Sequence, residues 1–147
     1  MSFEQTLTDV VTKGMNVVHQ GVLKLTGGRL GNTVFGMKAV HLHTTGRRSG
    51  QRRTVMLTAP IYEPGTRIVL IASKGGDDRH PDWYHNVVAH PDIEITDGDA
   101  TTTWTARTAT AEEKAELWPD IVAAYKGYAG YQKRTERDIP VVICEPR

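Results

Sequence analysis

The chain has 147 residues and a mass of 16.3 kDa, which fits one domain around one hydrophobic core. Hydrophobic residues make up 39% of it and charged residues 24%, so a wholly disordered chain is excluded. The formal charge of +1 argues against general attraction to nucleic acid or to an anionic membrane, and any anion site must therefore be local.

The N-terminal segment is expected to form an amphipathic helix over about 3–26, packed on or beside the rest of a single domain, 1–147. A capping-box pattern opens it, and apolar residues recur at helical spacing. Acidic residues replace the basic region of an export signal, and no apolar run is long enough for a membrane span. Contact of this helix with a membrane surface and the oligomeric state stay open.

The single Cys144 excludes an intrachain disulfide framework and a multi-cysteine zinc site. It suits a reducing compartment, so we expect a cytoplasmic protein. On an apolar strand, Cys144 is expected to be a small buried residue rather than a nucleophile.

Beyond Ala39, short β-rich runs bounded by turn residues predict about six strands. Pro64 and Gly65 favour a type II turn, and Asp97 and Gly98 are expected to supply the positive φ angles of a second hairpin. The stretch 29–38 reads as a loop. The runs are 39–45, 53–62, 67–73, 93–96, 101–108 and 139–144.

Two further helices are expected. Pro81 suits the first turn of a short one, and Thr110 with Glu113 forms a capping box before 111–125, where Pro119 is a candidate kink. Strands joined mainly by hairpins argue against a parallel doubly wound sheet. They predict a mainly β fold, a closed or partly open antiparallel β-barrel with peripheral helices.

The segment 46–53 concentrates four cations, Arg47, Arg48, Arg52 and Arg53, around two glycines and Ser49. Guanidinium groups, loop N–H groups and a hydroxyl can together bind phosphate or carboxylate oxygens. A solvated basic hairpin is the alternative interpretation.

A second candidate segment leaves a strand at Ser73 and Lys74, turns at Gly75 and Gly76, and enters a helix at Pro81. Glycines permit close approach of a ligand, and the helix N-terminus favours an anion. An ordinary polar glycine loop would look similar.

The histidines do not predict a metal site. His41 and His43 would share one face of a strand without a third ligand, and His80, His85 and His90 are spaced too far around a helix.

Tyr125, Tyr128 and Tyr131 recur every three residues and could share one face. Because Gly127 and Gly130 disfavour a rigid helix, we expect a mobile aromatic flap beside a flat substrate. Core packing of a helix end is the alternative.

Four segments in this order, TTGRRSGQRRT, IASKGG, HPDWYHN and YKGYAGYQKRTERDIPVVICEP, resemble the deazaflavin-dependent nitroreductases of actinobacteria. The resemblance implies a split antiparallel β-barrel related to the FMN-binding, pyridoxamine-phosphate-oxidase-like fold. It also implies reduced coenzyme F-420, an 8-hydroxy-5-deazaflavin with a phosphate and an oligoglutamate tail. The enzyme would pass a hydride to an electron-poor acceptor, namely a quinone, a nitroaromatic or an unsaturated lactone or enone.

The resemblance also implies roles for particular residues. On the acceptor side, as catalytic residues, it places Ser73, Tyr125, Tyr128 and Tyr131. Around the cofactor it places His43, Arg47, Arg48, Ser49, Gly50, Gln51, Arg52, Arg53, Ala72, Ser73, Lys74, Gly75, Trp83, Tyr84 and Asn86. Gly127, Gly130 and Arg134 depart from a fully aromatic flap, which leaves the acceptor undetermined.

Two alternatives remain at this point. One is an FMN-dependent reductase on the same barrel. The other is a non-enzymatic barrel that binds single-stranded nucleic acid through the segment 47–53, with Tyr62, Trp83 or Trp104 as stacking platforms. The low net charge makes a nucleic-acid partner unexpected.

Overall fold

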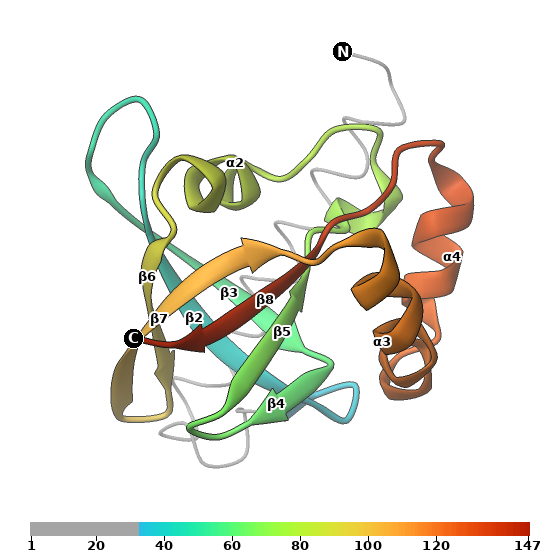
Figure 1. The fold of residues 1–147 in the computed structure, drawn as a ribbon, viewed down its shortest axis with the longest axis horizontal. Coiled ribbons are helices and arrows are strands. Elements are labelled where there is room, and N and C mark those ends of the chain that lie inside the picture. Colours follow the sequence, from blue (N-terminus) through green and yellow to red (C-terminus); the bar gives the residue numbers. More distant parts are fainter. Residues whose placement is uncertain (1–32) are drawn as a thin grey trace.

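Eight strands form one antiparallel sheet that curls into a half-barrel (Figure 1). The computed structural model describes residues 33–147, and the expected N-terminal helix lies outside the described residues. The strands are β1 Thr33–Val34, β2 Met37–Thr45, β3 Arg52–Ala59, β4 Ile61–Glu63, β5 Arg67–Ile71, β6 Asp92–Asp97, β7 Ala100–Thr108 and β8 Val141–Pro146.

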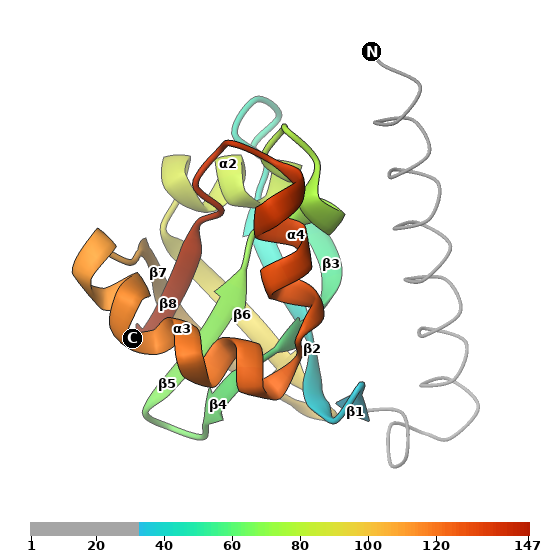
Figure 2. The same cartoon turned by 90° about the vertical axis from the view of Figure 1, so that its right-hand side faces the viewer.

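Within residues 33–147, three α-helices flank the sheet, together with the short 3-10 turn η1 Lys74–Gly76. Helix α2 lies across one end of the barrel, and α3 and α4 lie along one side (Figures 1 and 2). The helices are α2 Asp82–Ala89, α3 Ala111–Ala124 and α4 Gly127–Arg134. The predicted mainly β fold with peripheral helices is confirmed.

The strand order is β1-β2-β6-β7-β8-β5-β4, and β3 also pairs with β2. The register of β3 on β2 runs from Lys38 opposite Ala59 to Thr45 opposite Arg52. Strand β3 is therefore long and carries the segment 46–51 at its start.

Strands β5 and β8 are buried on both faces, which explains their continuous apolar runs. Ile68 and Leu70 face the barrel interior with Trp83 and Trp104. Val69 and Ile71, one residue along, face the other way and pack under α3 and α4 with residues such as Ile121 and Ile139. Alternation along each strand thus divides the core into two clusters.

The first predicted hairpin turn is confirmed. The Thr66 N–H donates to the Glu63 carbonyl at 3.0 Å, and Gly65 has the positive φ of +70° that a type II turn requires. The second hairpin is also present, but Asp97 was wrongly assigned to its loop.

In the second hairpin Asp97 pairs with Ala100, so the loop is Gly98-Asp99, and only Gly98 has a positive φ, +60°. A type II′ turn needs a positive φ at its first central residue alone, and this explains the shift.

Three other details of the sequence prediction were wrong. The expected loop 29–38 contains β1 and a turn in which Phe35 and Gly36 both have positive φ. The expected strand 53–62 is divided at Pro60, which lacks an N–H. The glycines of 125–131 do not prevent a helix, since Gly127–Arg134 is helical; Tyr128 packs in the core, as the alternative interpretation of core packing expected.

Helix α3 begins as expected. The Thr110 hydroxyl accepts from the Glu113 N–H at 3.1 Å, and the Glu113 carboxylate accepts from the Thr110 N–H at 2.9 Å. The helix continues through Pro119. Among residues 33–147, no helix is long and apolar enough to cross a membrane.

Candidate active site

A cavity of about 880 Å³ lies along β3, between the cationic segment 46–53 and the tyrosines that follow α3 and lie in α4. Its cationic wall carries Arg47, Arg48, Arg53, Lys74 and Arg79. Its aromatic wall carries Phe35, Tyr125, Tyr128 and Tyr131. Pockets for small molecules and cofactors measure roughly 300–1,000 Å³, so this cavity can hold a large organic ligand.

The segment after β2 is a tight backbone turn. The Gly46 N–H donates to the Gln51 carbonyl at 2.8 Å, and the Gly50 N–H donates to the Gly46 carbonyl at 2.9 Å. A Cβ on Gly46 would lie 2.6 Å from the Ser49 hydroxyl oxygen and 3.3 Å from the Gln51 carbonyl oxygen, so a larger residue there would displace the Ser49 side chain. The turn presents Arg47, Arg48 and Ser49 to the cavity.

Asn86, a buried residue of α2, holds this turn in place through two side-chain hydrogen bonds. Its side-chain oxygen accepts from the Arg47 N–H at 3.0 Å, and its amide nitrogen donates to the Thr44 hydroxyl at 3.3 Å. The Arg47 guanidinium also lies 3.9 Å from the Asp82 carboxylate. Helix α2 thus holds the basic turn at a defined place.

The second loop reaches the cavity through a left-handed run. Lys74, Gly75 and Gly76 have φ angles of +45°, +64° and +84°. A Cβ on Gly76 would lie 2.9 Å from the Tyr131 carbonyl oxygen, so no larger residue fits against α4. The run turns the chain so that Ser73, Lys74 and Gly75 all line the cavity.

Asp77 stabilises the far side of this loop. Its carboxylate is fully buried and accepts from the Arg79 guanidinium at 2.8 Å. The hydrogen bonds from Arg79 lower the pKa of Asp77, despite its burial. The ion pair holds Arg79 where part of its side chain lines the cavity.

The three tyrosines form one cluster. Tyr128 contacts Tyr125 and Tyr131 with ring centroids 5.2 and 6.2 Å away. Its hydroxyl lies 3.1 Å from the Thr58 hydroxyl on β3. Burial raises the pKa of Tyr128 to about 12 and also raises the pKa of Tyr131. Both are therefore neutral hydrogen-bonding groups near pH 7.

Phe35 extends the aromatic wall at the cavity mouth. Its ring stacks on Tyr125, with centroids 5.2 Å apart and planes within 19°. Its side chain is 59% exposed, and its φ of +53° is rare for a bulky residue. Together with Tyr125 it offers a flat apolar surface.

Most of the predicted site residues meet in this cavity. From the predicted set, the cavity wall contains Arg47, Arg48, Ser49, Arg53, Ser73, Lys74, Gly75, Trp83, Asn86, Tyr125, Tyr128 and Tyr131. Its wall does not include His43, Gly50, Gln51, Arg52, Ala72 or Tyr84.

His43 and Arg52 do not line the cavity, although one partner of His43, Thr54, does. The His43 ring nitrogens lie 2.8 and 2.7 Å from the hydroxyls of Thr54 and Thr96. Arg52 forms an ion pair with Glu94. The neighbour of His43 on β2, Thr44, is the residue that lines the cavity, so the strand presents its other face there.

Tyr84 and Ala72 also lie outside the cavity wall. The Tyr84 hydroxyl lies 2.9 Å from the Thr108 hydroxyl, on the other side of α2 from Asn86. Ala72 is fully buried in the core, and its N–H donates to the Pro140 carbonyl at 3.0 Å.

Sequence reasoning missed Phe35, Met37, Thr58 and Arg79. Arg79 shares its loop with Lys74, so its charge was a usable signal. Thr58 and Met37 carry none, because a strand residue does not reveal which face borders a cavity. Over residues 33–147 no three His, Cys, Asp or Glu side chains are grouped to hold a metal ion.

The fold has distant solved relatives. The protein related to general stress protein 26, of the pyridoxinephosphate oxidase family from Clostridium acetobutylicum, superposes with a TM-score of 0.50 at 12% identity. That match covers 74% of this chain and 73% of the other. The curled antiparallel half-barrel and its cavity therefore define a protein of this fold class.

Closer relatives identify the family. A model of the F420H(2)-dependent quinone reductase family matches residues 17–146. The F420H(2)-dependent quinone reductase Rv1261c of Mycobacterium tuberculosis is 38% identical over 134 residues, which cover 88% of this chain and 89% of that protein. A solved F420-H2 dependent reductase is 44% identical, with a TM-score of 0.65, over 73% of this chain and 93% of its own.

The chain belongs to the F420H(2)-dependent quinone reductase family. It is an oxidoreductase, and the resemblance to deazaflavin-dependent enzymes is confirmed.

Proposed function

We propose that this chain reduces a quinone with a hydride from F-420, with the cationic wall holding the cofactor and the aromatic wall holding the acceptor. The observation that carries the assignment of residues is that one cavity is lined both by a group of cationic side chains and by a group of aromatic rings. Nitroaromatics and unsaturated lactones are electron-poor in the same way and serve as secondary test acceptors.

The cavity fits the cofactor in size and in the chemistry of its donors. A phosphate and several glutamates need concentrated cations, and Arg47, Arg48, Arg53 and Lys74 face one cavity although the net charge of the chain is only +1. The Ser49 hydroxyl and Gly75 on the same wall give close polar contacts. Trp83 and the buried Asn86 support this wall from α2.

When bound, reduced F-420 supplies the hydride. The contribution of the chain is orientation: the walls hold two flat molecules in contact and exclude water from between them. In this proposal Tyr125 and Tyr131, whose hydroxyls lie 3.4 Å apart, donate hydrogen bonds to an acceptor oxygen. The Tyr128 hydroxyl donates to the Met37 sulfur at 3.6 Å and lies 3.1 Å from the Thr58 hydroxyl, so Tyr128 contributes mainly its ring to the acceptor side. Because the pKa values of Tyr128 and Tyr131 are raised, the proposal assigns them to orientation of the acceptor rather than to release of a proton.

The test compares cofactor with a full tail and the same deazaflavin without its tail. At low salt we expect the tail-free form to bind on the order of tenfold to a hundredfold more weakly, because several charge-assisted hydrogen bonds are lost. Fluorescence titration gives the dissociation constants. FMN and an oligonucleotide, titrated in parallel, test the two alternative functions.

Arg48→Ala should reduce this preference for the tail. Arg67→Ala is the matched control, because Arg67 pairs with Glu63 and does not line the cavity. Equal affinity for tailed and tail-free cofactor in the wild-type protein would contradict the assignment of the arginine segment.

The proposal also includes a cytoplasmic location, for which the single, buried Cys144 is the supporting observation. Contact of the N-terminal segment with a membrane surface is a separate proposal. Pelleting of the full chain with anionic vesicles tests it.

A further inference from the structure

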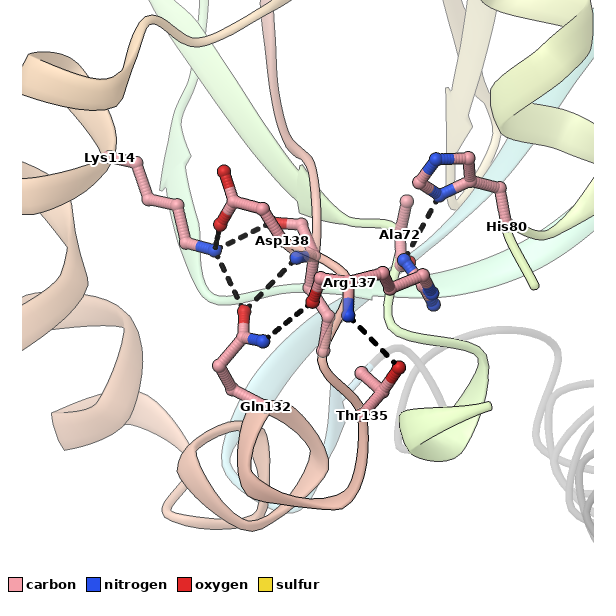
Figure 3. Close-up of polar contacts among 8 residues, drawn as sticks. Ala72, His80, Lys114, Gln132, Thr135, Arg137 and Asp138 are labelled. Carbon is pink, nitrogen blue, oxygen red and sulfur yellow. Dashed lines mark hydrogen bonds and ion pairs between the residues drawn. The ribbon is translucent and has the colours of Figure 1, made fainter. Parts of the chain in front are cut away.

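Arg137, between α4 and β8, binds the loop that carries Ser73 and Lys74. Its Nε donates to the Asp77 carbonyl at 2.8 Å, and its Nη2 donates to the carbonyls of Ala72 and Ser73 at 3.2 and 2.9 Å. Its Nη1 lies 3.0 Å from Nδ1 of His80. Figure 3 shows the guanidinium between Ala72 and His80. One side chain therefore contacts both ends of this loop.

These bonds determine which way the loop faces. The Ala72, Ser73 and Asp77 carbonyls flank the left-handed run 74–76, and each is directed to the guanidinium. A carbonyl that points at a cation does not point into the cavity, where its negative end would repel an anion. Lys74, between these carbonyls in the chain, lines the cavity.

The backbone around Arg137 is tied to the tyrosine helix. Gln132 of α4 donates to the Arg137 carbonyl at 2.8 Å and accepts from the Ile139 N–H at 3.0 Å. Lys114 of α3 donates to the same Gln132 oxygen at 2.9 Å (Figure 3). Because α4 carries Tyr128 and Tyr131, Arg137 joins the loop of the cationic wall to the helix of the aromatic wall.

We propose that Arg137 is a positioning residue for hydride transfer, which sets the cofactor loop against the acceptor tyrosines without lining the cavity itself. This inference rests on the function proposed above. Donor and acceptor must be held within a fraction of an ångström, so loss of this connection should weaken cofactor binding and slow turnover together.

The first test is Arg137→Met, which keeps an apolar stem and removes every donor. We expect the F-420 dissociation constant to rise about tenfold, and kcat with a quinone at saturating cofactor to fall by on the order of a hundredfold. Lys114→Met is the matched control, since it removes bonds to Gln132, Asp138 and Ile139 but none to the loop. It should lower the thermal midpoint and leave both constants close to wild type.

A second readout needs no cofactor. The Gly76 and Asp77 amides donate within the loop, to the carbonyls of Ser73 and Lys74 at 2.9 and 3.1 Å. Hydrogen exchange at these two amides should speed up in Arg137→Met and stay slow in Lys114→Met. Added millimolar guanidinium should partly restore slow exchange and cofactor affinity to Arg137→Ala, and should not change Lys114→Ala.

Unchanged exchange in Arg137→Met, or parallel changes in both methionine variants, would overturn the positioning role. Failure of the wild-type protein to bind F-420 or to reduce a quinone would instead count against the proposed function, and the exchange experiment would still decide the role of Arg137 in the loop.

Discussion

Lys74 of η1 and Tyr128 of α4 both line the cavity, and the proposal gives them to the cofactor and to the acceptor, so their substitution should separate two effects. Lys74→Ala should raise the F-420 dissociation constant. Tyr128→Phe should chiefly change kcat and KM for the acceptor, because it keeps the ring and removes only the hydroxyl that meets Thr58 and Met37, away from the cationic side chains. Titration and steady-state kinetics measure the two quantities. An equal loss of cofactor affinity in both variants would contradict the assignment of walls.

Cys144 lies on β8 with no exposed surface, and burial raises the pKa of its thiol to about 12. We therefore expect no reaction with a thiol reagent in the native protein and complete reaction after unfolding in denaturant, followed by absorbance. Thr105→Cys, an exposed position on β7, is the control and should react at once. Fast native labelling of Cys144 would show that β8 opens.

The alternation of strand residues between two faces explains which site residues could be predicted from the sequence and which could not. The two loops could be predicted from their glycines and clustered arginines, because such clusters are uncommon in segments that serve only a structural role. His43 was assigned to the cofactor, but a strand turns successive residues to opposite faces, and Thr44 is the residue at the cavity. The sequence motif therefore located the end of β2 correctly but did not show which face of the strand borders the cavity.

At the scale of the element, the capping box of α3 should be measurable. Thr110→Ala removes the acceptor for the Glu113 N–H and should cost about 1 kcal/mol of unfolding free energy. Urea unfolding measures it. Thr110→Ser and Thr110→Asp keep an acceptor and should stay near wild type. Equal losses in all three variants would show that the cap bond contributes little.

Turn chemistry and capping made most elements predictable. The Pro64-Gly65 turn and the Thr110 cap are local, so the sequence contains their causes. Helix α4 is different, since its two glycines disfavour it and the burial of Tyr128 against β3 decides the outcome. That contact joins residues 70 positions apart, which no local pattern reports.

For the whole molecule, two histidines predict acid sensitivity. Burial, followed by Arg137, lowers the pKa of His80, and burial, followed by Arg52, lowers the pKa of His43. The unfolded chain then takes up protons near the ordinary value of about 6.5, before the folded chain does. Stability is therefore fully present above that pH and is lost as the pH falls through the lower folded values.

Urea midpoints between pH 7.5 and 5 test this slope. The double variant His43→Gln, His80→Gln should show a flatter profile over the same range. Carboxylates with lowered pKa values, such as Asp77, take up protons only below this pH range, so they do not contribute to the slope of the urea midpoint between pH 7.5 and 5. A wild-type midpoint that rises on acidification would contradict the expected direction.

The contact of Gly76 with the Tyr131 backbone has a consequence for enzyme engineering. Gly76 packs so closely against α4 that no side chain fits between them. A change in the position of α4 should therefore also displace the loop that carries Ser73 and Lys74. Randomising α4 to broaden the acceptor range should therefore yield many variants with poor cofactor affinity. Val55 and Leu57 on β3 border the same space from a different element, so a library built there can reshape the acceptor surface and leave the loop in place.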